Sequence, residues 1–348
     1  MTKITFEPES NILFERVSNI IESARMTVVR TTNRTMVATY FLIGKQIVEH
    51  KQGGKEKAAY AKKIIENLSQ KLTDYYGSGY SVRYLEQMRK FYIIYGLRIP
   101  QTNFAEFEKV CQNFDLSWSH YLVLLRIKNE QERQFYEIES NKNFWNLDEL
   151  KRQLNSSLFE RLLISTDKNK VHELATKGQI VKKAQDLMKD PLVLEFLGLE
   201  DKAAYSENEL ETAIINQIEN FMLELGKGFF FGGRQVRFTF DEKHFKVDLV
   251  FYNRILQCFV LIDLKIGELT HQDLGQMQMY INFYDRFQKT ETENPTIGII
   301  ICKDKSDAIV EITLPANNQQ IFASQYQLYL PTKEQIRKLL ENKDENLL

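Results

Sequence analysis

The sequence predicts an α-helical N-terminal domain joined to an α/β domain in which helices flank a central mixed sheet. Apolar residues recur at spacings of three and four through most of residues 1–165, which is the period of an amphipathic helix. In the second half, helical patterns alternate with short apolar runs, and two of these runs form an apparent hairpin over residues 245–265. A chain of 348 residues is long enough for two domains with separate cores.

The composition is that of a soluble globular protein. Hydrophobic residues make up 43% and charged residues 27% of the chain, which excludes an intrinsically disordered protein. The net charge of −1 shows no overall basic excess, so any nucleic-acid binding would depend on locally placed Lys and Arg. We find neither a membrane-length apolar stretch nor a signal peptide and expect a cytoplasmic protein without a membrane partner. Cys111, Cys258 and Cys302 have neither zinc-site nor disulfide spacing.

The N-terminal domain, residues 1–165, is expected to consist of helices. Gly77-Ser78-Gly79 separates two of them, and Ser81 can cap the second, which is the outline of a helix-turn-helix. The first three predicted helices span residues 12–48, 55–76 and 82–95.

A polar stripe runs along the helix expected over residues 82–95. Arg83, Gln87 and Lys90 lie three and four residues apart, so they share one face of that helix. Such a stripe could contact phosphates or bases of nucleic acid, or it could be the solvated face of a bundle helix. Both interpretations remain open at this stage.

Residues 166–205 are charged, polar and poorly periodic, and we interpret them as a linker region before the second domain, residues 206–348. That domain should begin with a helix capped by Ser206, because Glu209 follows at capping-box spacing. Glu211 falls within the apolar stripe of this helix. An acid that faces inward suggests a contribution to a metal site; the alternative is a surface Glu that leans aside.

The hairpin over residues 245–265 contains acids where a buried strand should have none. Asp248 lies in its first strand and Asp263 in its second, and Lys265 shares a strand face with Asp263 because side chains alternate. A carboxylate among apolar residues is costly to desolvate unless a cation or donor compensates it. Mg²⁺ prefers oxygen ligands, and a nearby amine can stabilise charge on a phosphate. The pattern thus indicates phosphodiester cleavage, with an exposed Asp263–Lys265 salt bridge as the alternative.

The register of this hairpin is uncertain from the sequence. Closure by two to four residues near Asn253-Arg254 would place Asp248 opposite residues 259–261 and leave Asp263 beyond its direct partner. We therefore expect a bend or bulge that brings the two acids together. A lysine beside a bound metal and apolar strands is expected to have a lowered pKa.

The remaining segments extend the α/β pattern. A helix is predicted over residues 271–288 with Thr270 as its cap, and Gln276 and Tyr280 lie four residues apart on one of its faces. Residues 296–302 form a continuous apolar run, typical of a strand covered on both sides. Segments 306–314 and 319–328 should complete the layer, followed by a short polar helix from Thr332.

Asp248 followed by Asp263-Leu264-Lys265 resembles the motif of the PD-(D/E)xK nuclease superfamily. Residues 226–302 are similar to the nuclease domain of YhcG-like bacterial proteins, and the resemblance extends to segments 81–88 and 117–125, so it covers most of the chain. Two departures are present. Val247 stands where the motif has proline, and the second acid is Asp, the shorter of the two that the family allows.

The resemblance implies a restriction-endonuclease-like α/β core and a helical domain that assists nucleic-acid or partner binding. It implies that Glu211 is the acid of the superfamily's first helix, and that Gln276 and Tyr280 form a Q-x-x-x-Y motif that orients the site and contacts nucleic acid. The implied activity is Mg²⁺- or Mn²⁺-dependent hydrolysis of phosphodiester bonds, with DNA as the expected substrate, in defence, restriction or repair. Asp248 and Asp263 would bind the metal with help from Glu211, and Lys265 would position the nucleophile or balance charge.

Two alternatives are weighed against this interpretation. One is a catalytically inactive nucleic-acid- or protein-binding subunit of a restriction or defence assembly, against which the intact Asp248, Asp263 and Lys265 argue. Such a subunit should show no metal-dependent stabilisation. The other is a structure-selective junction resolvase, which shares the chemistry but needs two active sites in a homodimer; sedimentation and a branched-DNA assay would identify it.

Overall fold

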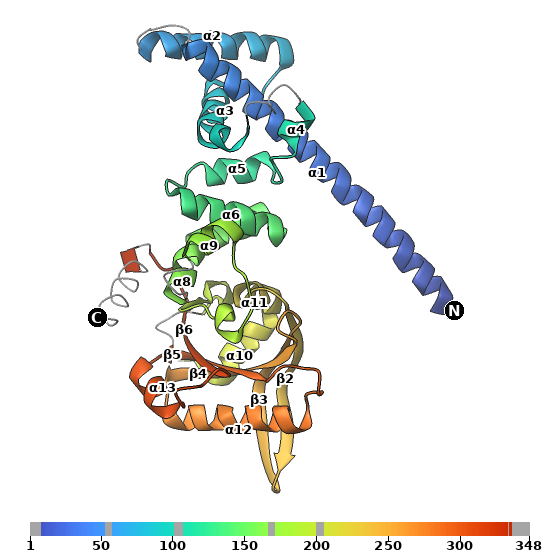
Figure 1. Ribbon diagram of the computed structural model, residues 1–348, viewed down its shortest axis with the longest axis vertical. Helices are drawn as coiled ribbons and strands as arrows, with labels where there is room; N and C mark the ends of the chain where they lie inside the picture. Colours follow the sequence, from blue (N-terminus) through green and yellow to red (C-terminus); the bar gives the residue numbers. More distant parts are fainter. Residues whose placement is uncertain are drawn as a thin grey trace. The chain divides into compact units, whose positions relative to one another are not determined.

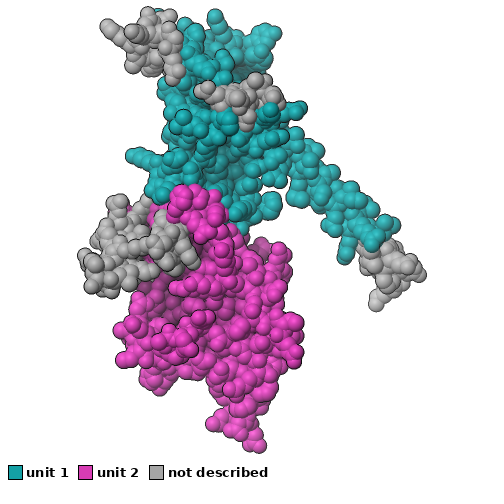
Figure 2. All heavy atoms as spheres, viewed as in Figure 1, with its two compact units in different colours: residues 1–150 teal, residues 151–348 magenta. Residues whose placement is uncertain are grey.

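The computed structural model describes residues 8–52, 58–100, 107–165, 171–199, 205–332 and 334–335. The chain divides into two compact units, residues 1–150 and 151–348 (Figure 2). The first unit is helical and the second contains a mixed sheet with helices (Figure 1), which confirms the predicted fold class. The polar helix expected from Thr332 falls mostly outside the described residues.

The N-terminal unit is built from helices that follow the predicted order. They are α1 (Pro8–Gln52), α2 (Ala58–Tyr76), α3 (Val82–Tyr95), the 3-10 turn η1 (Gly96–Arg98), α4 (Phe107–Cys111), α5 (Trp118–Leu124) and α6 (Glu130–Lys142). The division between the units falls within the next helix, α7 (Leu147–Asn155). Gly44 allows α1 to cross α3 closely, because a Cβ there would collide with the Met88 carbonyl oxygen. The N-terminal half of α1 extends away from the other helices of its unit (Figure 1) and exposes apolar side chains such as Leu13, Phe14 and Ile20.

Aromatic packing joins α1, α3 and α5. Phe91 is fully buried, and the ring centroids of Phe41, Phe114, Trp118 and Tyr121 lie 5.0–6.0 Å from its own. Tilted and edge-on pairs at such distances stabilise a core beyond the burial of their area. Across the described ranges, no helix combines the length and apolarity that crossing a membrane would require.

The second unit is organised around a six-stranded sheet in the order β1-β6-β5-β4-β3-β2. Its strands are β1 (Leu192–Val193), β2 (Phe229–Phe240), β3 (Lys243–Asn253), β4 (Cys258–Glu268), β5 (Ile297–Asp304) and β6 (Ile321–Gln327). Strands β2, β3 and β4 pair antiparallel, whereas β4, β5, β6 and β1 pair parallel. The sheet is therefore mixed, and β4 lies at the junction of its two halves.

Helices cover both faces of this sheet (Figure 1). On one face lie α10 (Glu207–Asn216) and α11 (Ile218–Leu225), and on the other α12 (His271–Phe287) and α13 (Asp307–Thr313). The unit also contains α8 (Leu158–Ser165), α9 (Val171–Lys177) and the 3-10 turns η4 (Ala184–Leu187) and η5 (Glu195–Leu197). Alternate residues of β4 separate two cores. Ile262 packs with α10 and α11, whereas Leu261 packs with α12.

Two elements differ from the sequence prediction. The single helix expected after Ser206 is interrupted at Gln217, whose φ of −120° and ψ of 33° leave the helical region and separate α10 from α11. Residues 306–314 do not extend the sheet but form α13. The Ser306 side chain accepts a hydrogen bond from the Ile309 amide at 3.4 Å, which begins a helix there.

Part of the segment interpreted as a linker belongs to the sheet unit. β1 pairs with β6, and Leu187, Leu192 and Leu194 are buried in the core beneath α10 and α11. The two units divide between Leu150 and Lys151, earlier than the boundary expected at 165. The segment shows little periodicity because short helices, 3-10 turns and a two-residue strand follow one another within it.

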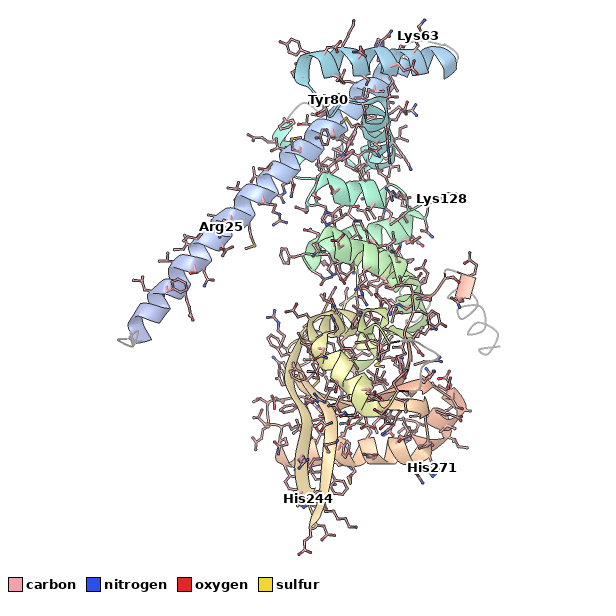
Figure 3. The ribbon with its side chains drawn as sticks, turned by 180° about the vertical axis from the view of Figure 1, so that it is seen from behind. Arg25, Lys63, Tyr80, Lys128, His244 and His271 are labelled. Carbon is pink, nitrogen blue, oxygen red and sulfur yellow. The ribbon has the colours of Figure 1, made fainter. Side chains whose placement is uncertain are left out.

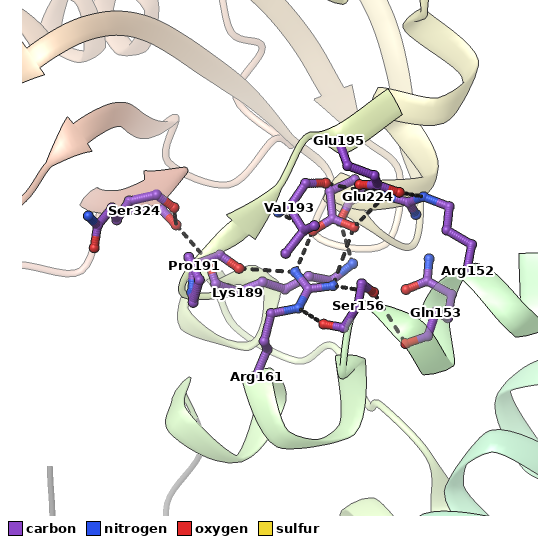
Figure 4. A network of polar contacts seen from close by, with 11 residues as sticks. Arg152, Gln153, Ser156, Arg161, Lys189, Pro191, Val193, Glu195, Glu224 and Ser324 are labelled. Atoms are coloured by element: carbon purple, nitrogen blue, oxygen red, sulfur yellow. Dashed lines mark hydrogen bonds and ion pairs between the residues drawn. The ribbon is translucent and has the colours of Figure 1, made fainter. Parts of the chain in front are cut away.

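A buried ion-pair network ties this segment to α11 (Figure 4). Glu224 is fully buried, and its carboxylate binds the Arg161 guanidinium, Arg152 at 3.2 Å and the Val193 amide at 3.0 Å. Burial disfavours the charged form of Glu224, but Arg161, Lys189 and Arg152 outweigh burial and lower its pKa to about 2.

We predict that Glu224→Gln lowers the free energy of unfolding of the sheet unit by about 3–5 kcal/mol, because Arg161 is left buried without its counter-charge. The folded-state pKa lies below the ordinary value of 4.5, so the wild-type advantage is complete above pH 4.5 and declines as the pH falls through about 2. Urea unfolding across this pH range measures both effects. Glu219→Gln, at an exposed acid of the same helix, is the control, and an equal loss in both variants would contradict the account.

Candidate active site

The loop between β3 and β4 determines which residues of the hairpin face each other. The closing pair is Asn253 and Cys258, so the loop contains the four residues 254–257. The buried Asn253 side chain accepts hydrogen bonds from two backbone amides of this loop at 3.0 and 3.1 Å. Pairing then continues without a register shift to Leu249 and Ile262. The loop has the predicted length, but the predicted register, with Asp248 opposite residues 259–261, was wrong because the turn is centred further along the chain.

Asp248 lies where β3 and β4 part. One further step in the observed register places it opposite Asp263. Its Oδ2 accepts a hydrogen bond from the Leu264 backbone amide at 2.9 Å, so the carboxylate takes the place of a ladder carbonyl. The strand also changes face here, since Val247 packs with α12 whereas Leu249 packs with α10 and α11. The strand is therefore irregular beside the two acids, as predicted. The irregularity lies where the β3–β4 pairing ends and is not a bulge between paired residues of these strands.

Asp263 and Lys265 share a face of β4, as the alternation predicted. Lys265 Nζ lies 2.9 Å from Asp263 Oδ2 and 3.7 Å from Asp273 Oδ1. The sequence analysis did not identify Asp273. Thr270 and Asp273 form a capping box that fixes this carboxylate in the first turn of α12, and their Thr-x-x-Asp spacing was the available signal.

The two strand acids share a strained electrostatic environment. Burial and the neighbouring Asp263 raise the pKa of Asp248 to about 6. Burial also raises the pKa of Asp263, although Lys265 opposes this effect. Burial acts to lower the pKa of Lys265, but contact with the Asp263 carboxylate outweighs burial, and the pKa is raised. The lowered pKa expected for a lysine beside a bound metal stays a prediction.

A divalent cation fits the Asp248–Asp263 pair. Asp263 is 3% exposed, and its Oδ2 lies 2.9 Å from the Lys265 ammonium. A hard cation would offset the repulsion between two such carboxylates. In the part of the chain that the structure describes, no group of three or more His, Cys, Asp or Glu side chains is arranged to hold a metal. A pair of acids suits Mg²⁺, which keeps several waters and takes further oxygens from phosphate.

Glu211 is buried in α10 and faces inward, as its position on the apolar stripe predicted. Its Oε2 accepts from the Gln235 amide at 2.7 Å, and its Oε1 pairs with the Arg234 guanidinium. Its charge contributes to the raised pKa of Asp248. Both oxygens thus bind side chains of β2, and the role of Glu211 in metal binding stays a prediction.

Gln276 and Tyr280 connect α12 to β3. The Gln276 amide donates to the Tyr280 hydroxyl, which donates to the backbone carbonyl of Lys246 at 2.9 Å. Tyr280 is buried, and Lys246 precedes Asp248 by two residues. This chain of hydrogen bonds holds the strand that carries Asp248 against the helix that carries Asp273.

The three residues of the polar stripe predicted on α3 differ in exposure and in hydrogen bonding. Lys90 Nζ donates to the Leu125 backbone carbonyl at 2.6 Å, at the C-terminal end of α5. Arg83 is exposed on α3, and Gln87 is half-buried. Nucleic-acid contact by these three residues stays a prediction, and Lys90 would have to leave its carbonyl partner to take part.

Comparison with known proteins shows related chains. Residues 185–341 match the family described as the YhcG PDDEXK nuclease domain, and residues 16–161 match the DUF1016 N-terminal domain. An Escherichia coli (strain K12) protein described as "Putative nuclease YhcG" is 37% identical over 345 residues, covering 93% of this chain and 92% of that protein. The chain belongs to the YhcG nuclease family. The YhcG nuclease-domain match includes all of Glu211, Asp248, Asp263 and Lys265.

Two solved structures align with part of this YhcG-family chain. One is a repair endonuclease from Pyrococcus abyssi, with 15% identity, a TM-score of 0.25, and coverage of 37% of this chain and 50% of that one. The other is described as an EndoMS-dsDNA2 complex, with 15% identity, a TM-score of 0.25, and coverage of 39% and 51%. The chain thus spans about half the length of either structure.

We predict that Asp248→Asn stabilises the chain when divalent ions are removed. The substitution relieves the repulsion with Asp263, while an amide oxygen can still accept from Leu264. The free energy of unfolding at neutral pH should rise by on the order of 1–3 kcal/mol, the upper end corresponding to the pKa change from 3.8 to about 6. Thermal melting in a chelator measures this gain. Asp304→Asn, at an exposed acid of β5, serves as the control, and a lower melting temperature for Asp248→Asn would contradict the electrostatic account.

Proposed function

We propose that this chain is a divalent-metal-dependent nuclease that hydrolyses phosphodiester bonds in DNA, with Mg²⁺ or Mn²⁺ as the metal. The observation that carries the proposal is the pair of carboxylates formed by half-buried Asp248 and buried Asp263, beside the ammonium of Lys265. Membership of a nuclease family supports the same reaction class. A fold alone would not do so, because function depends on the groups that the fold positions.

Asp248 and Asp263 are the proposed metal-binding residues. The repulsion between the two acids favours a shared cation. When bound, such a cation activates water and stabilises negative charge on phosphate oxygens. The two side chains come from neighbouring strands of a packed sheet, which holds them more rigidly than loops would.

Lys265 is proposed to act as a fixed positive charge. Its raised pKa means that it stays protonated at neutral pH, so it cannot serve as a general base while paired with Asp263. In hydrolysis, water adds to phosphorus, negative charge accumulates on the non-bridging oxygens, and the bond to one nucleoside oxygen breaks. An ammonium group held by Asp263 and Asp273 can stabilise that charge without moving far.

Gln276, Tyr280 and Glu211 are proposed as positioning residues. Gln276 and Tyr280 hold the backbone of Lys246 and thereby the start of the strand segment that carries Asp248. Glu211 holds β2 through Arg234 and Gln235, beside the same segment. Release of one Glu211 oxygen would let it assist the metal, directly or through water.

We predict that the purified full-length chain nicks or cuts duplex DNA in Mg²⁺ or Mn²⁺ and not in a chelator. Asp263→Ala should reduce the rate by more than about 100-fold. Mutation of a residue that only supports a metal ligand typically costs about 10- to 100-fold in activity, and loss of the ligand itself should cost more. Gel assays on supercoiled and linear DNA, and on RNA of the same sequence, measure activity and substrate class.

Glu268→Ala provides the matched control, because Glu268 is an exposed acid on the same strand. It should cut DNA at the wild-type rate. Wild-type cleavage by Asp263→Ala would refute the assignment of the site, and cleavage of RNA alone would refute the choice of DNA.

A further inference from the structure

The β2–β3 hairpin continues beyond the point where β4 ends its pairing with β3. The last β3–β4 pair is Leu249 and Ile262, whereas β2 and β3 stay paired from Val236 and Val247 to Phe240 and Lys243. Figures 1 and 3 show this two-stranded extension projecting past the sheet, with His244 close to its free end. Because the pairing has no register shift in this extension, successive side chains of each strand point to opposite faces.

One face of the extension is fixed against α12. Phe238 stacks on Phe245 with ring centroids 5.4 Å apart and on Phe283 of α12 at 4.0 Å. Val236 and Val247 belong to the same core. Because strand side chains alternate, Arg237 and the residues opposite it must face away from α12.

The outward face presents two cations directly opposite each other. Arg237 pairs with Lys246 across the hairpin, and Thr239 pairs with His244 in the next position on this face. Arg237, Lys246 and His244 are exposed. Like charges at directly opposed positions destabilise an antiparallel pair. We call Arg237 and Lys246 the basic pair.

Neither side chain of the basic pair has an ion-pair partner among the described residues. Asp248, two residues after Lys246, is the nearest acid of the hairpin, and its Oδ2 accepts a hydrogen bond from the Leu264 amide. Asp241 and Glu242 lie at the turn, four residues from Arg237 and from Lys246 respectively. Arg234 of the same strand differs, because Glu211 neutralises it. The hairpin therefore holds two exposed, directly opposed positive charges that form no ion pair within the described ranges.

The basic pair lies close to the candidate active site. Lys246 precedes Asp248 by two residues, which is about 7 Å along an extended strand. Its backbone is fixed by the hydrogen bond from Tyr280. A nucleic-acid strand with one phosphate at Asp248 and Asp263 could thus place a neighbouring phosphate at these cations.

We propose that Arg237 and Lys246 bind the phosphate backbone of duplex DNA next to the phosphate that is cleaved. This inference rests on the proposed function only for the identity of the ligand, because the subsite itself needs no catalysis. Two cations on a ribbon that projects from the sheet can follow a backbone, and anions between them would relieve their repulsion. Tyr280 then has a further role, since it sets the distance from this subsite to Asp248.

The test measures binding of a short DNA duplex by the full-length chain in a chelator, where cleavage cannot occur. The dissociation constant is measured between about 50 and 200 mM salt, where each phosphate contact contributes about 0.9 to the logarithmic salt slope. Arg237→Gln/Lys246→Gln should lower the slope by nearly two and weaken binding at least about tenfold at the lowest salt. Lys243→Gln, which loses the same charge on the face of Phe240, should keep the wild-type slope.

The outcomes separate this proposal from that of the nuclease. An unchanged slope in the double variant, equal losses in Lys243→Gln, or no duplex binding by the wild type would each overturn the subsite. If the double variant lowers the salt slope but the wild type cuts no DNA in Mg²⁺, the subsite is supported and the nuclease proposal is refuted. Poly-glutamate that binds more tightly than DNA and responds to the same variants would show a protein ligand instead. Thermal melting must show the double variant folded, and loss of the repulsion should leave it at least as stable as the wild type.

Discussion

The structure of the candidate site depends on one electrostatic constraint, the confinement of two carboxylates where β3 and β4 separate. Each would be more stable in water or protonated. The fold nevertheless holds Asp248 through the Leu264 amide and Asp263 within the central strand, among side chains that exclude water. Such an arrangement is unfavourable by itself, and a shared cation is the simplest way to offset it.

The neighbouring groups limit how this strain can relax. Lys265 lies between Asp263 and Asp273, so it can neutralise only part of the charge. The hydrogen bonds from Gln276 through Tyr280 prevent β3 from moving away from α12. In the basic pair of the hairpin two positive charges are likewise held close together, and a bound anion would offset their repulsion. The cation proposed for the acids and the phosphates proposed for the basic pair would both be supplied by a metal-bound nucleic acid.

Local rules explain which parts of this arrangement the sequence predicted. Alternation along a strand placed Asp263 and Lys265 on one face, and the helical period turned Glu211 inward. The register of the hairpin could not be predicted, because it depends on the buried Asn253 side chain that organises the loop. Lys90 could not be predicted either, because its partner, the Leu125 carbonyl, comes from a distant segment. Non-local contacts of this kind have no periodic signature.

The most direct measurement of the central claim is anomalous scattering from crystals of the full-length chain soaked in Mn²⁺. The account predicts a peak within bonding distance of both Asp248 and Asp263, which disappears in Asp263→Ala crystals. A well-ordered site without such a peak, or with the two carboxylates turned apart and Mn²⁺ bound elsewhere, would contradict the account.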